Sequence, residues 1–576
     1  MKKLLPLLKD YKKETILGPL FKLLEAAFEL LIPLVMKSII DVGIKNEDTT
    51  FIITRCLLMI SLGVIGLICS VTAQYFAAKA AVGFSTKLRH KLFSHIQSLS
   101  FSEIDKLGTA TLITRMTSDI NQVQNGVNLV LRLFLRSPFI VFGAMIMAFT
   151  INVKAALIFA VTIPLLSIVV FGVMLASIPL FKKVQKGLDK ILGITRENLT
   201  GVRVIRAFNK EQDELEAFSE GNEALMKIQV FAGKVTAVMN PLTYVIINTA
   251  TVILINSGAV KVDAGILTRG DVIALVNYMS QILVELVKLA NLIISVTKAA
   301  ACGNRIESVL DTAPSINEDS NSDVKPVFNS EYAVEFENVE MRYNVTGEPA
   351  LSGISFKVKK GETVGIIGGT GSGKSSLVHL IPRFYDASSG SVKVAGKDVK
   401  EYGAHNLRDC VGIVMQKAML FKGTIKDNLL WGKGDAAEDE LINAVEVAQA
   451  LEFVEKKEDG LNSIVGQEGK NFSGGQKQRL SIARAIVKHP DILILDDSAS
   501  ALDFATDAKL RQAIKNIGGD VTVFIVSQRT SSIQHADKII VLDEGRMAGI
   551  GTHDELLKNC DVYKEIYNSQ FKGNNQ

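Results

Sequence analysis

The chain is poor in the residues that stabilise small secreted and metal-binding proteins. Of its 576 residues only five are cysteines, an odd number, scattered without a CxxC pair or another metal-ligand spacing. A disulfide or zinc framework is therefore disfavoured. The single tryptophan, Trp431, carries no visible signal, and a formal net charge of +4 gives no indication of a nucleic-acid partner.

Proline is scarce as well, and its distribution is informative. None of the 12 prolines falls within residues 79–132 or 181–234, which are polar with scattered apolar residues at helical spacing. Because proline interrupts helices, its absence favours helices here. If each stretch holds two helices of about 25 residues, each pair extends about 40 Å.

Apolar residues, by contrast, are abundant and unevenly placed. They make up 48% of the chain, the mean hydropathy is +0.26, and charged residues still account for 22%. Residues 1–300 contain long apolar runs, whereas residues 330–576 have the pattern of a soluble α/β domain. Crossing a bilayer takes about 20 apolar residues. The sequence predicts six such spans, at residues 16–41, 56–78, 133–151, 155–178, 241–260 and 271–296.

The start of the chain departs from a simple membrane pattern. Residues 1–14 resemble a signal sequence, but charges cut the apolar run short and no small-residue cleavage site follows. This segment is therefore predicted to be an interfacial helix. The first span is interrupted by charged side chains, namely Lys22, Glu25, Glu29 and Lys37.

Basic residues differ sharply between the segments that join the spans. The stretches 79–132 and 181–234 contain seven and ten Lys or Arg residues, whereas the three short loops together contain five. Loops rich in Lys and Arg remain on the cytoplasmic side. The bias predicts a multi-pass protein of the cell membrane, with both long stretches, both termini and the C-terminal α/β domain in the cytoplasm.

Two spans carry polar stripes at helical spacing. Polar groups are costly in hydrocarbon, so these faces should meet water or one another. Two interpretations remain open: a substrate path, or hydrogen bonds between helices. The stripes are Asn240, Tyr244, Asn248 and Thr251 on the fifth span, and Asn277, Gln281, Glu285 and Lys288 on the sixth.

One stretch of the C-terminal part indicates nucleotide chemistry. Residues 368–375 read GGTGSGKS, which fits G-x-x-x-x-G-K-[ST] at every fixed position, between a strand-like run and a helix-like run. Backbone N–H groups of such a loop bind phosphate oxygens, assisted by the helix N-terminus. Lys374 is expected to reach the β- and γ-phosphates of ATP, and the Ser375 hydroxyl to ligate Mg²⁺.

Further motifs follow at the ends of apolar segments. One strand-like run ends at Gln416, and residues 472–476 read FSGGQ in front of a helix-like run. A buried strand ends in two aspartates at 496–497, followed by SALD at 500–503. Another buried strand leads into SQR at 527–529. Acidic and amide side chains at strand ends suit a phosphate and Mg²⁺ site.

This order of motifs resembles that of an ATP-binding cassette (ABC) exporter half of the bacterial multidrug-resistance type, over the whole length of the chain. The resemblance implies a membrane all-α domain at residues 1–310, with six transmembrane helices and long intracellular extensions. It implies a linker at 311–330 and an α/β P-loop nucleotide-binding domain with a helical subdomain at 331–576. Coupling helices are implied near residues 118–123 and 201–207.

The resemblance also implies roles for single residues and the cofactors ATP and Mg²⁺. The implied ATP-binding residues are Tyr343, which would lie under the adenine, and Gly368, Gly369, Thr370, Gly371, Ser372, Gly373, Lys374, Ser375, Ser376 and Gln416. The implied Mg²⁺ ligands are Ser375, Gln416 and Asp496. The implied catalytic residues are Asp497 and Gln528, together with Ser473, Gly475, Gln476 and Asp503, of which the signature residues would act on ATP bound by a partner.

Two positions depart from the family pattern. The family has Glu where this chain has Asp497, and His where it has Gln528. Asp is one methylene shorter, which withdraws its carboxylate by about 1.5 Å, and Gln cannot exchange a proton as His does. Both changes predict a site that binds ATP and hydrolyses it poorly. Since the signature differs only at Phe472, the pattern is that of a heterodimeric exporter with a different ABC half-transporter as partner.

The sequence is also compatible with other functions. A homodimeric exporter, a lipid flippase and a non-transporting, ATP-sensing membrane regulator are the alternatives. The predicted spans disfavour a soluble ABC ATPase of DNA repair or translation, and an importer usually has its spans on separate chains. The expected partners are membrane lipid and a drug-like or lipidic small-molecule substrate, without nucleic acid.

Overall fold

The structure, a computed structural model of the chain, describes residues 3–316, 324–344, 347–498, 500–517 and 521–571. Part of the predicted linker, residues 317–323, therefore lies outside the described residues. The chain forms two compact units. Unit 1 comprises Met1–Ile96 and Thr109–Thr312, and unit 2 comprises Gln97–Gly108 and Ala313–Gln576.

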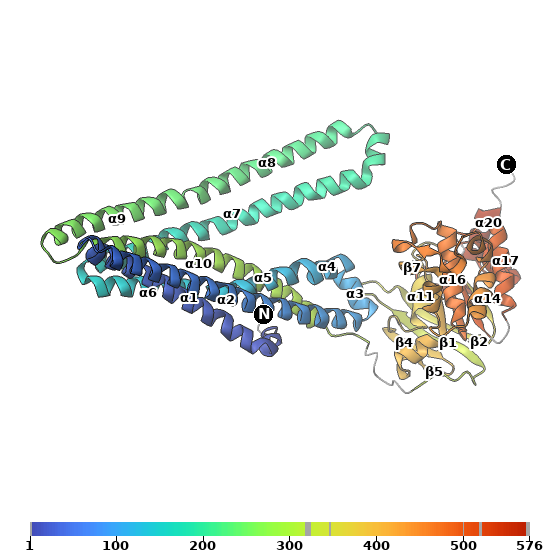
Figure 1. Cartoon of the computed structure of the whole chain (residues 1–576). Coiled ribbons are helices and arrows are strands. Elements are labelled where there is room, and N and C mark those ends of the chain that lie inside the picture. Colours follow the sequence, from blue (N-terminus) through green and yellow to red (C-terminus); the bar gives the residue numbers. More distant parts are fainter. Residues whose placement is uncertain (1–2, 317–323, 345–346, 499, 518–520, 572–576) are drawn as a thin grey trace. The chain divides into compact units, whose positions relative to one another are not determined.

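The described part of unit 1 is helical (Figure 1). Local signals begin its helices: Asn152 accepts a hydrogen bond from the Ala155 amide at 3.0 Å, and Thr268 and Asp271 form a reciprocal capping box. The helices are η1 (Leu5–Tyr11), α1 (Lys12–Ser38), η2 (Ile39–Ile44), α2 (Thr49–Gln97), α4 (Thr109–Thr114), η3 (Arg115–Asp119), α5 (Ile120–Leu133), α6 (Arg136–Ile151), α7 (Val153–Ala207), α8 (Glu211–Ala237), α9 (Met239–Asp263) and α10 (Arg269–Leu310).

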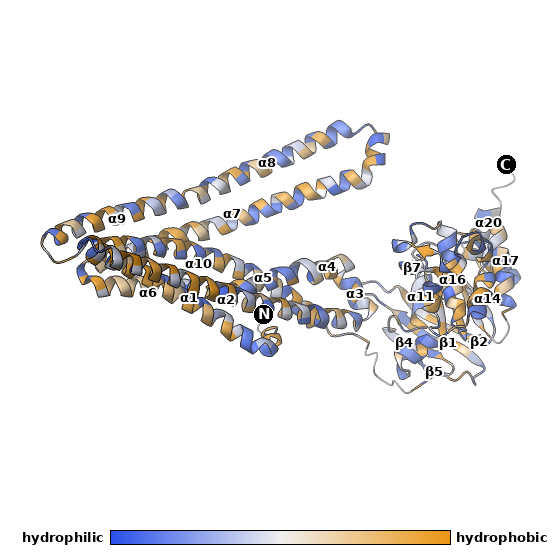
Figure 2. Cartoon of the chain, in the orientation of Figure 1, coloured by the Kyte–Doolittle hydropathy of each residue, from blue (hydrophilic) through white to orange (hydrophobic). Residues whose placement is uncertain are grey.

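Five helical stretches within the described residues are long and apolar enough to cross a membrane. They contain the last five predicted spans, and hydrophilic residues become more frequent along α8 and the second half of α7 (Figure 2). The first predicted span lies in α1 and η2, where charged side chains interrupt the apolar run, so it stays a prediction. The five stretches are Thr49–Gln97, Thr109–Ile151, Val153–Ala207, Glu211–Asp263 and Arg269–Leu310.

The two proline-free stretches fold differently. Helix α7 runs for 55 residues, roughly 80 Å, and α8 packs against it (Figure 1). This is the helix pair that the sequence predicts for residues 181–234. Residues 79–132 contain the two predicted helical segments, the end of α2 and the continuous stretch from Thr109 that comprises α4, η3 and α5, but the short helix α3 (Phe101–Leu107) lies between them. The chain breaks at Ser100, which is extended, and at Gly108, whose φ of 75° ends α3.

Charged residues of unit 1 are buried in contacts between α1, α6 and α10. Arg136 of α6 lies 2.6 Å from Glu285 of α10 and 2.7 Å from Glu29 of α1. Glu285 is only 2% exposed and also accepts hydrogen bonds from Ser137 and Lys288, both at 2.8 Å. Removing one member of such a cluster leaves an uncompensated buried charge. The cluster therefore holds these three helices in one arrangement.

The two predicted polar stripes have different surroundings. Glu285 of the α10 stripe takes part in the interhelical cluster, which supports the helix-packing interpretation for that residue. Three members of the α9 stripe, Asn240, Tyr244 and Asn248, are exposed on this chain. For the α9 stripe the substrate path stays a prediction.

Unit 2 is built on three sheets (Figure 1). The largest has the order β12-β11-β3-β10-β9-β6, with only the β11–β12 pair antiparallel; the others are β2-β1-β4-β5 and β7-β8. The strands are β1 (Tyr332–Met341), β2 (Leu351–Lys359), β3 (Thr363–Gly368), β4 (Ser389–Val394), β5 (Lys397–Asp398), β6 (Val411–Val414), β7 (Gly423–Thr424), β8 (Ile464–Val465), β9 (Ile492–Asp496), β10 (Thr522–Val526), β11 (Lys538–Asp543) and β12 (Arg546–Gly551).

Helices surround these sheets within the described residues. Along β9, side chains alternate between two hydrophobic clusters, with Leu493 in one and Ile494 in the other, so both faces of the sheet are covered. The helices are α3 and α11 (Lys374–Leu380), η4 (Val399–Glu401), α12 (Ala404–Asp409), α13 (Ile425–Leu430), α14 (Glu438–Val447), α15 (Leu451–Glu455), η5 (Gly460–Asn462), η6 (Gln467–Gly469), α16 (Gly474–Val487), α17 (Phe504–Lys515), α18 (Thr530–Ile533), α19 (His553–Asn559) and α20 (Asp561–Phe571).

Helix α3 belongs to unit 2 although it precedes most of unit 1 in the chain. The Phe101 ring lies 4.6 Å from the Phe384 ring, and the Tyr385 hydroxyl donates to Asp105 at 2.6 Å. Residues 118–123, where the resemblance implies a coupling helix, lie in η3 and α5 of unit 1, and their role as a coupling helix stays a prediction.

Candidate nucleotide-binding site

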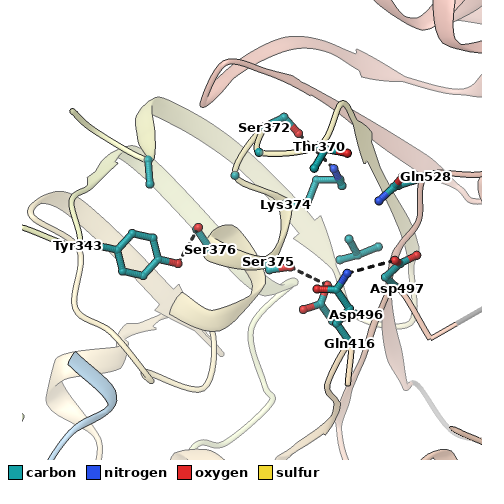
Figure 3. A pocket seen from close by; sticks show the side chains of 14 residues that line it. Tyr343, Thr370, Ser372, Lys374, Ser375, Ser376, Gln416, Asp496, Asp497 and Gln528 are labelled. Carbon is teal, nitrogen blue, oxygen red and sulfur yellow. Dashed lines mark hydrogen bonds between the residues drawn. The ribbon is translucent and has the colours of Figure 1, made fainter. Parts of the chain in front are cut away.

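A cavity of about 350 Å³ lies where the parallel strands of unit 2 end. The loops that follow β3, β6, β9 and β10 all contribute to it, as expected for ligand sites at the carboxyl ends of parallel strands. Figure 3 shows the labelled side chains of these loops together, with Tyr343, which follows β1, on the other side of the P-loop. The lining residues are Tyr343, Ala350, Thr370, Gly371, Ser372, Gly373, Lys374, Ser375, Ser376, Gln416, Asp496, Asp497, Val526 and Gln528.

The P-loop forms one wall of this cavity and leads from β3 into α11. Gly373 precedes α11 with a φ of 92°, and a Cβ there would lie 2.7 Å from the Ala350 carbonyl oxygen, so glycine is required. Lys374 donates to the carbonyl oxygens of Gly368 and Gly369 at 2.9 and 2.6 Å. Burial lowers the pKa of Lys374, and the carboxylates of Asp496 and Asp497 oppose that shift. The wall thus presents one cation and the N-terminus of a helix.

Three oxygen-bearing side chains lie together beside the P-loop. The Ser375 hydroxyl donates to Asp496 at 3.0 Å, and Gln416 lines the same part of the cavity (Figure 3). The described residues hold no cluster of three or more His, Cys, Asp or Glu side chains suited to a metal. Mg²⁺ needs no such cluster, because it is commonly bound by one or two carboxylates, water and substrate phosphates. The hydroxyl, amide and carboxylate donors therefore fit Mg²⁺ bound together with a nucleotide.

Asp497 follows the strand that carries Asp496 and has an unusual backbone conformation. Its φ is 46°, and its amide donates to the Val526 carbonyl oxygen at 3.0 Å. Its carboxylate accepts a long hydrogen bond of 3.4 Å from the Gln416 amide. Burial raises the pKa of Asp497, while that hydrogen bond and the charges of Lys374 and Arg529 act against the rise. The carboxylate is thus held at the cavity wall by one weak contact.

Gln528 and Tyr343 lie on opposite sides of the P-loop (Figure 3). Gln528 follows β10 and is near Asp497, and its backbone carbonyl accepts from Gln570 at 2.7 Å. Tyr343 is 44% exposed, and its hydroxyl lies 2.8 Å from that of Ser376. An exposed aromatic face at the edge of a phosphate-binding loop is suited to stacking on a base.

The signature residues lie outside this cavity. Ser473 caps α16, accepting from the Gln476 amide at 3.3 Å, and the Gln476 side chain accepts from the Ser473 amide at 3.0 Å. A Cβ at Gly474 would meet no atom of this chain within 4 Å, whereas one at Gly475 would lie 3.0 Å from the Ala501 carbonyl oxygen. Asp503 also lies outside the cavity, and it caps α17 by accepting a hydrogen bond from the Thr506 amide at 2.9 Å.

Some residues at the site were not predicted. Ala350 and Val526 line the cavity without a distinctive sequence signal. His379 lies with its Nε2 atom 3.6 Å from an Asp496 oxygen. The sequence could have predicted this position of His379, because it follows Ser375 by four residues on α11, and residues four apart lie on the same face of a helix.

Family comparisons agree with this geometry. The family model of the ABC transporter transmembrane region matches residues 15–286, and the ABC transporter model matches residues 351–500. The chain is also similar to a solved structure of a bacterial Atm1-family ABC exporter with ATP bound. The TM-score is 0.79 at 23% identity, with 97% of this chain and 98% of that chain covered, which establishes a shared fold.

Curated relatives match over nearly the whole length. One is YfiB of Bacillus subtilis, an uncharacterized ABC transporter ATP-binding protein, 37% identical over 571 residues and 99% of both chains. Another is YgaD of the same organism, a putative multidrug export ATP-binding/permease protein, 33% identical over 580 residues and 99% of both chains. The predictions of a transport ATPase and of a multi-pass membrane location are confirmed. The chain therefore belongs to the ABC transporter family, as an exporter half-transporter whose cytoplasmic nucleotide-binding domain hydrolyses ATP.

Proposed function

We propose that this chain is the slowly hydrolysing half of a heterodimeric ABC exporter. Its own site binds MgATP and turns it over slowly, and its signature completes the catalytic site of a different partner half. The cargo is a drug-like or lipidic small molecule. The observation that carries this proposal is the presence of Asp497 and Gln528 at the wall of the cavity, opposite a complete P-loop.

Binding of ATP would use residues that already converge on the cavity. Lys374 and the P-loop amides hold the phosphates, and Tyr343 stacks on the adenine. Ser375, Gln416 and Asp496 would hold Mg²⁺ beside the phosphates. When bound, Mg²⁺ neutralises charge on the β- and γ-phosphate oxygens.

Slow turnover follows from the length of the Asp497 side chain and from the proton chemistry of Gln528. An aspartate carboxylate ends about 1.5 Å short of a glutamate carboxylate, and a displacement of about 1 Å can cost about 100-fold in rate. The 3.4 Å contact with Gln416 is too long to hold the Asp497 carboxylate firmly against a water molecule. Gln528 can orient a phosphate oxygen but cannot accept a proton.

The signature has the features needed to act on a nucleotide held by another chain. Ser473 and Gly474 lie at the start of α16, where backbone N–H groups and the helix dipole favour an anion. The space in front of Gly474 is free of atoms of this chain, so a phosphate can approach closely. The altered residue, Phe472, is 6% exposed and packs in the core, which leaves the phosphate-facing residues unchanged.

Two assemblies make different predictions for purification. In a heterodimer, tagged full-length chain expressed in its native host retains a second, different ABC half-transporter at equal amounts. In the alternative homodimer or lipid flippase, the chain is recovered as a dimer of itself with MgATP hydrolysis of its own. Mass spectrometry of the detergent-purified complex distinguishes the two, and recovery of a homodimer alone would overturn the heterodimer.

A second measurement on the same complex distinguishes an exporter from a non-transporting sensor. An exporter changes its ATP hydrolysis rate when its cargo binds, because transport and hydrolysis share conformations. A panel of drug-like and lipidic compounds should therefore contain at least one that stimulates ATPase activity and is transported into inverted vesicles. Hydrolysis that no transported compound alters would favour the regulator.

We also propose that α1 and η2 form the first of the six predicted spans, at residues 16–41. With residues 79–132 and 181–234 in the cytoplasm, α2 begins on the outer side at Thr49, so α1 must cross for the N-terminus to be cytoplasmic. The contact between Glu29 and Arg136 accounts for one charge in α1. In a background without native cysteines, a cysteine replacing Asp48 should react with an impermeant reagent in intact cells. One replacing Asp189 should not, and the reverse pattern would contradict this topology.

A further inference from the structure

Unit 2 contains a second cavity, of about 320 Å³, that lies apart from the nucleotide site. Its lining comes from α17, from β10 and the start of β3, and from the segment between Ser532 and Asp537, which includes the end of α18. None of these lining residues also lines the nucleotide cavity. A ligand in this second cavity would therefore not occupy the space of a nucleotide.

The floor of the second cavity is apolar. Val523 and Ile525 of the central strand β10 line it and are 5% and 8% exposed, whereas Phe524, on the other face of the sheet, is fully buried. Helix α18 has only four residues, so it covers little of the sheet beside it. Apolar surface that water reaches at the bottom of a cavity favours the binding of an apolar group.

Two cations of one helix line the same cavity. Arg511 and Lys515 are one turn apart on α17 and share a face of it. Arg511 Nε lies 3.3 Å from an Asp507 oxygen but donates no hydrogen bond, and Lys515 has no hydrogen-bond or ion-pair partner among the residues that the structure describes. The one carboxylate of the lining, Asp537, already accepts from the Thr363 amide at 2.8 Å. The cations thus leave donors available to an anion.

The cavity also borders the link between two segments of the ATPase machinery. Helix α17 begins after Asp503, and α18 begins two residues after Gln528. The Ser532 hydroxyl of α18 donates to Asp507 of α17 at 3.0 Å, and both side chains are buried. Because Asp507 is also the ion-pair partner of Arg511, an anion that binds Arg511 competes with the carboxylate that joins α17 to α18.

We propose that this cavity is a regulatory site for a small organic anion with an apolar body, such as an aryl or branched-chain carboxylate. The apolar body lies on Val523 and Ile525, and the anionic group binds Arg511 and Lys515, since a guanidinium pairs well with a carboxylate. By drawing Arg511 away from Asp507, the bound anion shifts α18 and changes the rate of ATP hydrolysis. This inference needs hydrolysis by the complex but does not depend on which half carries it.

The first test measures binding of trifluoromethylbenzoate to the purified full-length complex in lipid nanodiscs, by fluorine NMR. Saturating MgADP fills the nucleotide sites throughout. Binding should saturate with a Kd of about 1 mM or below, the strength expected for a ligand of this size. Acetate lacks the apolar body and trifluoromethylbenzyl alcohol lacks the charge, so each should bind at least about tenfold more weakly.

Charge variants locate the anionic group of the probe. Arg511→Gln should weaken its binding by about tenfold and Lys515→Gln by about threefold, since Lys515 is the more exposed. Lys509→Gln makes the same change of charge at an exposed position of α17 that does not line the cavity. Its Kd should stay within about twofold of the wild-type value, because salt screens an exposed charge at a distance.

A second pair of variants leaves the ion pair between Arg511 and Asp507 intact. Ala508 lines the cavity and is exposed, so Ala508→Phe fills the space without removing a core contact and should abolish saturable binding. Ala508→Ser leaves the space open and should bind as wild type does. Both variants should still bind ATP, which shows that the domain is folded.

The regulatory effect is measured as steady-state ATP hydrolysis with and without saturating trifluoromethylbenzoate. In the wild-type complex the rate should change by at least about twofold, as expected for two coupled sites. In Ala508→Phe the rate should be the same with and without the probe, whereas Ala508→Ser should respond as wild type does.

Each contrary result overturns a stated part of the inference. Equal binding of the benzoate and the alcohol would mean that the anionic group is not recognised. Unchanged binding in Ala508→Phe would place the probe elsewhere, and an equal loss in Lys509→Gln would assign the effect to overall charge. Saturable binding in this cavity without a change in hydrolysis would contradict the regulatory role.

Discussion

Two faces of the nucleotide-binding domain, the P-loop at residues 368–375 and the signature at residues 472–476, differ in how far they keep the residues of the family pattern. The P-loop face encloses a cavity with Lys374 and a helix N-terminus, yet has Asp497 and Gln528 at its two reactive positions. The signature face, at Ser473, is open and is altered only at a core residue. In the proposed function, the groups that bind ATP and the groups that complete turnover therefore lie on different faces of this chain.

The largest expected effect comes from the signature face. Replacing Ser473→Arg removes the hydroxyl that caps α16 and inserts a bulky cation where the partner's phosphate is proposed to bind. We expect ATP hydrolysis by the purified pair to fall by about 100-fold or more, since removing one transition-state donor already costs about that much. The measurement is steady-state phosphate release, with ATP binding determined separately.

A control for this variant is available in the same domain. Thr552 precedes α19 in a capping box with Glu555, which accepts from the Thr552 amide at 2.9 Å, and it belongs neither to the cavity lining nor to the signature. Thr552→Arg loses a cap worth about 1 kcal/mol, as Ser473→Arg does. It should therefore lose some stability but less than about twofold in activity. Equal loss from both variants would mean that capping, and not phosphate contact, explains the result.

A smaller effect is expected from the P-loop face. Lys374→Ala removes a buried cation from this chain's own site, and ATP should bind there much more weakly. If turnover takes place at the partner's site, as proposed, total hydrolysis should fall by only about tenfold, through the weaker association of the two domains. Lys397→Ala, at an exposed position of β5, is the neutral control. A fall as deep as that of Ser473→Arg would make the two faces equivalent.

The mildest loss should follow removal of the altered base itself. Asp497→Ala deletes a carboxylate held by one 3.4 Å contact. The steady-state rate of the pair should change by less than about threefold, because that carboxylate stands about 1.5 Å short of a working position. Should Asp497→Ala abolish activity, Asp497 is a functioning base and this chain is a catalytic subunit.

Restoring the family's Glu and His at positions 497 and 528 tests whether these two residues account for slow turnover at the P-loop face. The double variant Asp497→Glu with Gln528→His should raise total turnover by up to about twofold, the limit when a second equal site becomes active. Asp497→Gln in the same Gln528→His background is the matched control, with the length of Glu and no basic oxygen. An increase in this control as well would show that the added length, and not the base, is responsible.

Much of the site could be predicted because its parts are fixed by local chemistry. A P-loop needs glycines and a following helix. Because the carboxyl ends of parallel strands lie at the same edge of a sheet, Gln416, Asp496 and Gln528 lie at that edge, regardless of the loops between the strands. The motif spacing therefore placed these residues around one cavity. Which strands are neighbours is set by long-range pairing that a single sequence does not display.

Other features depend on contacts that periodicity does not reveal. A polar stripe has the same sequence pattern whether it faces water or another helix, and only the ion pair with Arg136 distinguishes the two for Glu285. Helix α3 has only seven residues, too few for a periodic signal, so its position came from packing against Phe384 and Tyr385. In α1, charged side chains interrupt the apolar run, so its hydropathy alone does not identify it as a membrane span.

The most direct test of the asymmetry is a single-turnover experiment on the purified complex. The pair is loaded with two molecules of radiolabelled ATP, Mg²⁺ is added in a rapid-quench device, and product is followed over time. The account predicts two phases of equal amplitude, with the slow one at least about 100-fold slower than the fast one. A single phase that consumes both molecules at one rate would contradict it.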